Sequence, residues 1–268
     1  MAVSGDQEKA RRSDKEMRVA LVQGASRGIG FHMTRALLDD DRYEQVFATC
    51  RCPASAAALE ALRLSRKRSQ SQLRVLRLNV LDEETIAEAS DMVEAQTDRV
   101  DLLINCSGVL HADGLLWPEK RLADLRAEAV DLAFRVNALG PLLVARSFES
   151  VLRASQSARF VALSARVGSI GDNRRGGWYA YRASKAALNM LIRTLAIEWL
   201  RLPRPVSCFA LHPGTVATDL SQPFRKNLSA KQVFSPVKAA EQLLGTIHGL
   251  TAEQSGSFYA YDGKPIEW

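Results

Sequence analysis

The sequence predicts a doubly wound α/β fold, a parallel sheet of about seven strands with helices on both faces. Short hydrophobic runs alternate with segments of helical spacing along the whole chain. The runs are almost continuously apolar, which is typical of strands that are buried on both faces. No linker or shift in composition divides the 268 residues. We therefore expect a single domain over residues 18–268.

The expected elements follow one another in a regular order. Strands are expected at 18–24, 45–50, 73–80, 100–108, 158–165, 205–214 and 256–261. Helices are expected at 29–40, 54–64, 82–96, 121–153, 179–201 and 236–250. The long helical region at 121–153 is interrupted near Gly140-Pro141, and Asp82 is a suitable N-cap for its helix. Such an alternation is characteristic of parallel strands joined by crossover helices.

The first 17 residues do not share this pattern. They lack the apolar core of a signal peptide, and acids such as Asp6 and Glu8 argue against an organelle transit peptide. We interpret residues 1–17 as a disordered tail. No apolar run approaches the roughly 20 residues that span a bilayer. We therefore expect a cytoplasmic protein that does not contact a membrane.

Charge and cysteine spacing argue against a nucleic-acid or metal site. The net charge is +6, and much of the excess lies at 63–77, which contains no acid. No aromatic residues interleave this run for base stacking, so we interpret it as a solvated helix end and loop. Cys50 and Cys52 are separated by one residue, which is not a zinc spacing. We expect no metal and no nucleic-acid partner.

A glycine-rich loop, GASRGIG at 24–30, joins the first expected strand to the first expected helix. Gly24, Gly28 and Gly30 permit a tight turn and a close approach of the backbone to a ligand. The N-terminus of the following helix offers free N–H groups and a positive dipole end to a pyrophosphate. In this strand–loop–helix context the motif predicts a Rossmann-type dinucleotide site.

The end of the second strand indicates which dinucleotide binds. An acid at that position suits the 2′-hydroxyl of NAD, whereas an arginine suits the 2′-phosphate of NADP. The strand ends in ATCRCP, which contains Arg51 and no acid, and Arg27 lies in the glycine loop. These residues predict NADP(H) as the cofactor.

The segment GGWYAYRASKAALNM at 176–190 contains two phenols. Tyr181 has a lysine, Lys185, four residues later, which places both side chains on one helix face, and Tyr179 has none. The pair is either a packing arrangement or a phenol whose pKa is lowered by the ammonium. A lowered pKa would suit an acid catalyst.

Several segments together resemble the short-chain dehydrogenase/reductase family. They are GASRGIG (24–30), NCSG (105–108), VNALGP (136–141), YRASK (181–185) and HPGTVATDL (212–220). The resemblance extends from about residue 18 to the C-terminus. The longer strings GSIGDN, GGWYAYRASKAALNM and FYAYDGKPIEW resemble the branch of C-factor-like and sniffer-like carbonyl reductases.

The resemblance implies an NADPH-dependent reduction of an aldehyde or ketone. Tyr181 would be the general acid that protonates the carbonyl oxygen. Lys185, with the positive nicotinamide of the oxidised cofactor, would lower the pKa of Tyr181. Lys185 would also bind the nicotinamide ribose. Asn137, in VNALG, would hold a water molecule of the proton relay.

The family's serine at the end of the fifth strand is replaced here by Ala165, in SARVGS at 164–169. We expect Ser169 to supply the missing hydroxyl, because its distance from Tyr181 in the sequence is close to that of the family serine. Ser164 is the alternative, although successive side chains on a strand point to opposite faces.

The resemblance also implies the cofactor-binding set. Its residues are Gly24, Ser26, Arg27, Gly28, Ile29, Gly30, Arg51, Asn79, Val80, Asn105, Ser107, Gly108, Tyr181, Lys185, Pro213, Gly214, Val216 and Thr218. Asn79 stands where many relatives carry an aspartate, and its amide oxygen can still accept from the adenine amine. NCSG departs from the family's usual N-A-G form, but Cys106 and Ser107 are both small.

Two other functions remain open at this point. A 3-oxoacyl-thioester reductase would need a cationic approach for its carrier, which the run at 63–77 could supply. A non-catalytic NADP(H)-binding protein, with a signalling or redox-sensing role, is favoured by Ala165. The expected pocket segments, 109–118, 173–178 and 220–234, carry apolar and aromatic residues that suit a small apolar or aromatic carbonyl substrate. Family members are often dimers, so the resemblance allows a homodimer.

Overall fold

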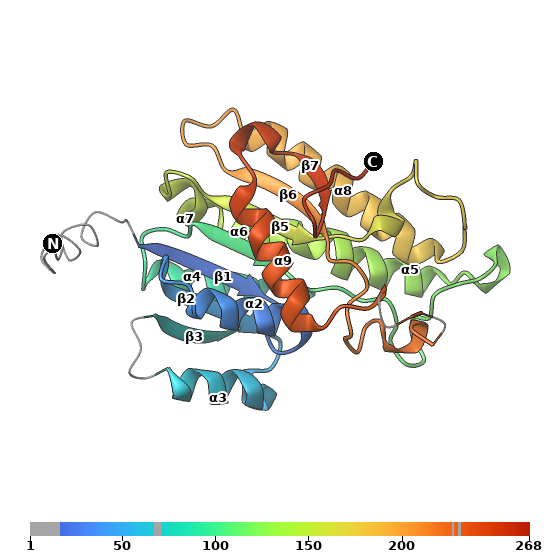
Figure 1. The fold of residues 1–268 in the computed structure, drawn as a ribbon, viewed down its shortest axis with the longest axis horizontal. Helices are drawn as coiled ribbons and strands as arrows, with labels where there is room; N and C mark the ends of the chain where they lie inside the picture. The colour runs from blue at the N-terminus through green and yellow to red at the C-terminus, as the bar shows by residue number, and fades with distance from the viewer. Residues whose placement is uncertain (1–16, 67–70, 227, 230–231) are drawn as a thin grey trace, which may run out of the picture.

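Seven parallel strands form one sheet with helices on both faces, as the sequence predicts (Figure 1). The computed structural model describes residues 17–66, 71–226, 228–229 and 232–268, so most of the predicted tail lies outside the described residues. The strands are β1 (Arg18–Gln23), β2 (Tyr43–Cys50), β3 (Gln72–Arg77), β4 (Leu102–Asn105), β5 (Arg159–Leu163), β6 (Ser207–His212) and β7 (Ser257–Ala260). They are arranged in the order β3-β2-β1-β4-β5-β6-β7.

The order of the strands determines where a ligand can enter. The chain leaves β1 toward β2 and β3 on one side and returns to β4 on the other side of β1. Gln23 pairs with Asn105 at the carboxyl ends of β1 and β4. In an open parallel sheet a crevice forms at such a reversal point, outside the carboxyl ends of the strands.

Two helical layers cover the sheet. One layer contains α2 (Gly28–Leu38), α3 (Ala57–Ser65) and α9 (Pro236–Gly249), and α2 and α9 cross in front of the sheet in Figure 1. The other contains α4 (Glu83–Glu94), α5 (Ala127–Phe134), α6 (Gly140–Ser147), α7 (Glu149–Ala154) and α8 (Tyr179–Trp199). No helix of the described residues has the length and apolarity needed to cross a membrane.

Burial of the long helix α8 anchors the residues that follow the strands. Its Leu188, Ile192 and Trp199 are almost fully buried, and the Trp199 ring packs edge-on against Phe160 of β5. Each such side chain stabilises the fold by about 1.5–3 kcal/mol through removal of apolar surface from water. The N-terminal half of α8 is thereby held against the carboxyl end of β5.

The region 121–153, predicted as one helical region with a break near Gly140, is several helices. A π turn, η3 (Arg135–Leu139), separates α5 from α6, and α7 follows at Glu149. Pro141 has no N–H group for an intrahelical bond, so the helix cannot continue regularly through it. A Cβ at Gly140 would lie 2.7 Å from the Val80 Cβ, so only glycine permits this close packing. Single π turns inside helices are frequent at functional sites.

A polar cluster joins α9 to the amino end of β2. Arg42 Nη2 lies 2.9 Å from His248 Nδ1, and the Tyr43 hydroxyl lies 3.1 Å from His248 Nε2. Because a guanidinium only donates, Nδ1 accepts and the ring is neutral. Burial, together with the charge of Arg42, lowers the pKa of His248 to about 4.

This shift predicts a pH-dependent stability. The unfolded chain takes up a proton at His248 near pH 6.5, whereas the folded chain does so only near pH 4. The free energy of unfolding should therefore fall as the pH is lowered from 6.5 to 4. His248→Gln should make this fall shallower, measured by urea unfolding across that window. His212, whose pKa burial also lowers to about 4, is present in both proteins. Parallel curves for the two proteins would contradict the assignment to His248.

Candidate active site

Tyr181 and Lys185 lie at the edge of the sheet where the strands end. Both belong to the first two turns of α8, and their exposed fractions are 9% and 3%. Lys185 Nζ donates to the carbonyl oxygen of Leu163, the last residue of β5, at 2.8 Å. The same Nζ lies 6.0 Å from the centre of the Tyr181 ring. The predicted pair is therefore brought together in a buried position.

Asn137 ties this helix to the segment after β4. Its Oδ1 accepts from the Val109 N–H at 2.7 Å, and its Nδ2 donates to the Val109 carbonyl at 2.8 Å and to Ser184 Oγ at 3.0 Å. Ser184 Oγ in turn donates to the Tyr181 carbonyl at 2.9 Å. A Cβ at Gly108 would lie 3.4 Å from Asn137 Oδ1 and 3.7 Å from Lys185 Nζ, so both groups border that glycine. Both Nδ2 protons are engaged, which leaves acceptor capacity on Oδ1.

In the chain alone the pKa of Tyr181 is raised, whereas the sequence-based expectation of a lowered pKa includes the charge of the oxidised cofactor. Burial raises the pKa of the Tyr181 hydroxyl above its ordinary value, and burial lowers the pKa of Lys185 to about 8. Removal from water disfavours the phenolate and the ammonium alike. The protein therefore holds Tyr181 as a neutral hydroxyl.

Among the described residues, the hydroxyls of the two serines near the end of β5 have partners other than Tyr181. Ser164 Oγ donates to Asn189 Oδ1 of α8 at 2.6 Å. Ser169 Oγ accepts from the Asp172 N–H at 3.2 Å within the following turn. Ala165 and Tyr181 belong to one buried apolar cluster. The structure thus places the Ser169 hydroxyl in a turn and Ala165 in the apolar surroundings of Tyr181.

Aromatic side chains from three segments form a wall that continues from Tyr181. The Trp178 ring lies 6.2 Å from the Tyr181 ring and 5.1 Å from the Phe224 ring, measured between centroids. Phe224 in turn contacts Trp117 at 5.4 Å and His111 at 5.9 Å. Leu110, Val167 and Leu220 complete the apolar surroundings. In contrast, Tyr179 is 40% exposed and lies outside these ring contacts.

The glycine loop is as tight as a dinucleotide site requires. Gly24 and Gly28 have φ values of 81° and 57°, and a Cβ at Gly24 would lie 3.0 Å from the Ser107 N. A Cβ at Gly30 would lie 2.3 Å from the Gly24 carbonyl oxygen. No side chain caps α2 and no acid lies in its first turn. The loop therefore presents uncapped backbone N–H groups without a competing negative charge, and it fits a diphosphate.

Cations lie at the carboxyl ends of β2 and β3. Arg51 follows β2 directly and is exposed, and Arg77 is the register partner of Cys50 on β3. Arg27 of the glycine loop pairs with Asp219 at 3.1 Å, with both side chains largely exposed. Such a pair is screened by solvent and is readily exchanged for another anion. This corner of the site is suited to a phosphate group.

The other predicted cofactor residues line the same edge. Asn105 is 1% exposed, its Oδ1 accepts from Ser107 Oγ at 3.0 Å, and its buried Nδ2 has no partner among the described residues. Asn79 Oδ1 accepts from the Leu81 N–H at 3.2 Å, and Val80 packs on Gly140. Asn79 and Asn105 thus lie at the carboxyl ends of β3 and β4, on the two sides of β2 and β1.

The segment after β6 closes this edge from the other side. A Cβ at Gly28 would lie 3.1 Å from Thr218 Cγ2, so Thr218 packs directly on the glycine loop. Gly214 has a φ of 76° and packs against Phe234, and Val216 is buried. The remaining predicted residues are Ser26 and Ile29 in the loop and first turn of α2, and Pro213 after β6.

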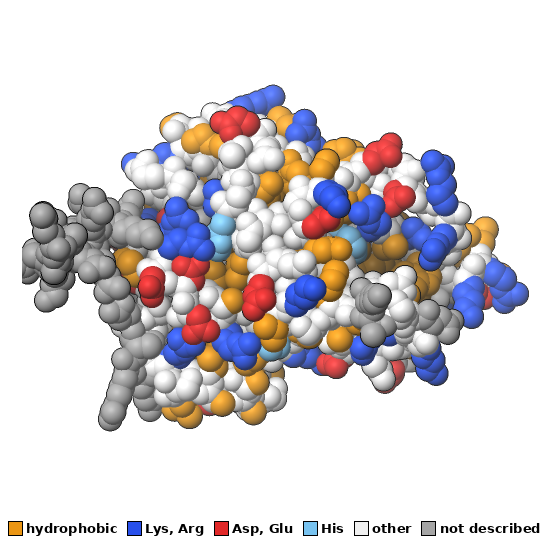
Figure 2. Space-filling view, viewed as in Figure 1, with side chains coloured by type: hydrophobic (Ala, Val, Ile, Leu, Met, Phe, Trp, Pro, Cys, Tyr) orange, Lys and Arg blue, Asp and Glu red, His pale blue; other side chains and the backbone are white. Residues whose placement is uncertain are grey.

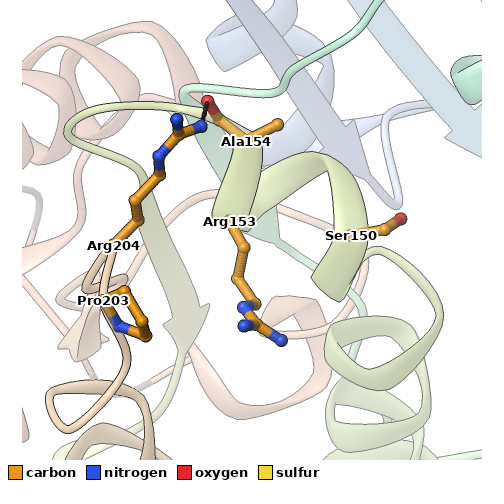
Figure 3. A pocket seen from close by; sticks show the side chains of 5 residues that line it. All are labelled: Ser150, Arg153, Ala154, Pro203 and Arg204. Carbon is orange, nitrogen blue, oxygen red and sulfur yellow. Dashed lines mark hydrogen bonds between the residues drawn. The ribbon is translucent and has the colours of Figure 1, made fainter.

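Other surface features lie away from this edge. A pocket of about 390 Å³ is lined by Ser150, Arg153, Ala154, Pro203 and Arg204 (Figure 3). These residues precede β5 and β6, so the pocket lies at the amino edge of the sheet. Within the described residues no cluster of His, Cys, Asp or Glu could hold a metal ion.

The basic run at 63–77 is also remote from Tyr181. Residues 67–70 lie outside the described residues, and the remainder lies at the end of α3 and on β3. The strands β2, β1 and β4 separate β3 from β5. On the face shown in Figure 2, basic and acidic side chains are interspersed. This arrangement offers no support for a carrier approach along the run.

Three residues of the site were not predicted from the sequence. Val109 and Ser184 hold Asn137, and Arg77 at the end of β3 is the register partner of Cys50. None of them forms a recognisable spacing with its partner, because each contact joins separate elements. The alternation of strands was the available signal for Arg77, since it predicts that β2 and β3 end at one edge.

Comparison with known proteins identifies the family of this chain. The family model for short chain dehydrogenases matches residues 18–229. The C-signal protein of Myxococcus xanthus is 37% identical over 172 residues, which is 64% of this chain and 95% of that protein.

Two solved structures share the fold over 94% of this chain and 100% of theirs, each with a TM-score of 0.82. They are the carbonyl reductase Sniffer of D. melanogaster, at 25% identity, and the NADPH-bound carbonyl reductase from chicken fatty liver, at 30% identity. The resemblance to C-factor-like and sniffer-like proteins is confirmed by these relatives. The chain belongs to the short-chain dehydrogenase family.

Proposed function

We propose that this protein is an NADPH-dependent reductase of small apolar or aromatic aldehydes and ketones. The observation that carries the proposal is the buried placement of Tyr181 and Lys185 at the strand ends that also carry the glycine loop. The Sniffer and chicken liver proteins, which share the fold, are both named carbonyl reductases, and the latter binds NADPH.

Glycine-loop N–H groups would bind the diphosphate, and Arg51, Arg27 and Arg77 would surround the 2′-phosphate. Lys185 and Asn137, which both border Gly108, would bind the ribose and a relay water. When bound, NADPH supplies the hydride that converts a carbonyl carbon to an alcohol carbon. Every other chemical task falls to the residues of the chain.

Tyr181 would donate its hydroxyl proton to the carbonyl oxygen as negative charge develops there. Burial raises the pKa of Tyr181, so the proton is present at neutral pH. The ammonium of Lys185, with a pKa of about 8, remains largely charged at neutral pH and stabilises the phenolate that the transfer leaves behind. Its bond to the Leu163 carbonyl fixes the position of that charge.

The side chains around Tyr181 support the choice of substrate. The wall of Trp178, Phe224, Trp117 and His111 continues from the phenol, and Ala165 and Leu110 pack beside it. Aromatic rings favour offset or edge-on contacts with other planar groups. An apolar or aromatic carbonyl compound would therefore be held with its oxygen toward Tyr181.

A second candidate function has one observation in its favour. Ala165 stands where the family carries a serine, and it belongs to the same apolar cluster as Tyr181. A non-catalytic NADP(H)-binding sensor would tolerate this replacement. Binding of NADPH without turnover of any carbonyl compound would support the sensor and refute the reductase. A homodimeric assembly and a cytoplasmic location stay predictions.

Replacement of the acid tests the reductase directly. Tyr181→Phe should lower the rate of NADPH oxidation by at least about 100-fold, because general acid catalysis contributes that much. NADPH affinity, measured by fluorescence titration, should change little. Tyr179→Phe is the matched control, since Tyr179 is exposed two residues earlier, and it should keep the wild-type rate. Equal activity of the two variants would refute the role of Tyr181.

Two variants, at Ala165 and Ser169, test which residue could act as the oxyanion donor. Ala165→Ser should raise kcat on the order of tenfold, because an oxyanion donor would be added beside Tyr181. If Ser169 supplies the missing hydroxyl, as the sequence suggests, kcat of Ser169→Ala should fall strongly. If Ser169 only accepts from Asp172 in its turn, kcat should change less than about threefold. Steady-state rates of the same aldehyde with both variants give the answer. We expect the second outcome for Ser169→Ala.

Cofactor choice is tested at the end of β2. Arg51→Ala should raise the Kd for NADPH about tenfold, because one charge-assisted contact to a phosphate is lost. The Kd for NADH, which lacks the 2′-phosphate, should stay unchanged. Arg153→Ala, at the opposite edge of the sheet, is the control and should affect neither cofactor. An equal loss of affinity for both cofactors would contradict a 2′-phosphate contact.

A further inference from the structure

The helix that carries Tyr181 begins without a cap of its own. Its N-cap is Trp178, whose backbone is left-handed with φ 54° and ψ 44°, and no side-chain cap is formed. Among the described residues Trp178 is the single non-glycine with a positive φ. The first N–H groups of a helix have no intrahelical partners, and a bulky residue in this conformation is strained. Another part of the chain must therefore hold this end of α8.

Glu119 holds it from about 60 residues earlier in the chain. Its carboxylate Oε2 accepts from the Ala180 N–H at 3.3 Å, and its backbone carbonyl accepts from the Trp178 N–H at 2.6 Å. The residue is only 3% exposed, although a buried carboxylate is costly. The positive end of the α8 dipole offsets part of that cost.

These two bonds act on both groups that would contact a substrate. Ala180 and Tyr181 are consecutive, so a shift at Ala180 moves the phenol. Trp178 is held by the second bond. Its ring packs edge-on against the Tyr181 ring, with centroids 6.2 Å apart, and also contacts the Phe224 ring. Glu119 also follows Trp117, another ring of that wall.

A second anchor holds the same loop but not the same atoms. Arg182 Nε donates to the Gly177 carbonyl at 3.0 Å, and its Nη1 donates to the Val167 carbonyl at 3.2 Å. Arg182 therefore ties the loop to the segment after β5. The N–H groups of Trp178 and Ala180, by contrast, both donate to Glu119.

We infer that Glu119 is a positioning residue that orients Tyr181 and Trp178 for the proposed reduction. The inference rests on the proposed function for its catalytic consequence, whereas the clamp on α8 can be observed without turnover. Neither carboxylate oxygen needs to touch substrate or cofactor. Its effect passes through the backbone of residues 178–180.

Two variants distinguish the effect of the hydrogen-bond acceptor of Glu119 from the effect of its side-chain volume. Glu119→Leu removes the acceptor and keeps a buried apolar side chain, whereas Glu119→Gln keeps an acceptor oxygen for the Ala180 N–H. A control, Ser235→Ala, removes the cap of α9, where Ser235 Oγ accepts from the Lys238 N–H at 3.2 Å. All four proteins are compared for kcat and KM with one aldehyde and for amide hydrogen exchange across 176–184.

Glu119→Leu should lower kcat by about 10- to 100-fold, since small displacements of a catalytic group have effects of that size. Its KM should rise as Trp178 loses its anchor, and amide exchange across 176–184 should accelerate. Glu119→Gln should restore kcat to within about threefold of wild type and restore the slow exchange. Ser235→Ala should leave kcat and that exchange unchanged.

Two results would overturn the inference. Unchanged exchange at 176–184 in Glu119→Leu would show that no clamp exists. Faster exchange with unchanged kcat and KM would show that the clamp serves stability alone. If wild type reduces no carbonyl compound, the proposed function fails, and the exchange experiment alone then decides whether Glu119 holds α8.

Discussion

The bond between the Lys185 ammonium and the Leu163 carbonyl is the constraint on which the site depends. It joins α8 to the last residue of β5 and keeps a cation in a position that is 3% exposed. An ammonium in such a place requires good hydrogen-bonding partners, because burial alone opposes its charge. The packing of Trp199 and Ile192 on the sheet supplies the rigidity that keeps helix and strand in register. Asn137 then reaches the same helix through Ser184.

The parts of this arrangement that follow from local periodicity were accessible in the sequence. Apolar runs and helical spacing predict the seven strands, and the glycine spacing predicts the tight turn at Gly24 and Gly30. The four-residue spacing of Tyr181 and Lys185 predicts a shared helix face. These patterns are set by the geometry of a single element, so they need no knowledge of its neighbours.

The parts that depend on distances between elements were not accessible. The pKa of Tyr181 was expected to fall because of Lys185 and the oxidised nicotinamide, whereas in the chain alone burial raises it. Ser184 accepts from Asn137 across two separate segments, which no spacing along the chain indicates. Glu119 carries no motif at all, because its partner Ala180 comes from another segment. Sequence spacing fixes a face of a helix, whereas these three cases are decided by which segments meet.

The apolar surroundings of Tyr181 have two opposing effects on the proposed reaction. Ala165, in the apolar cluster of Tyr181, would leave the developing oxyanion without one hydrogen-bond donor, which on its own would weaken catalysis. The same exclusion of water strengthens the attraction between the Lys185 ammonium and the charge that forms near Tyr181, because electrostatic interactions grow as the effective dielectric constant falls. A fixed cation also needs no reorganisation as the charge develops. The proposed reaction would therefore rely on a buried charge rather than on a serine hydroxyl, and its rate would depend on how closely α8 is held in place.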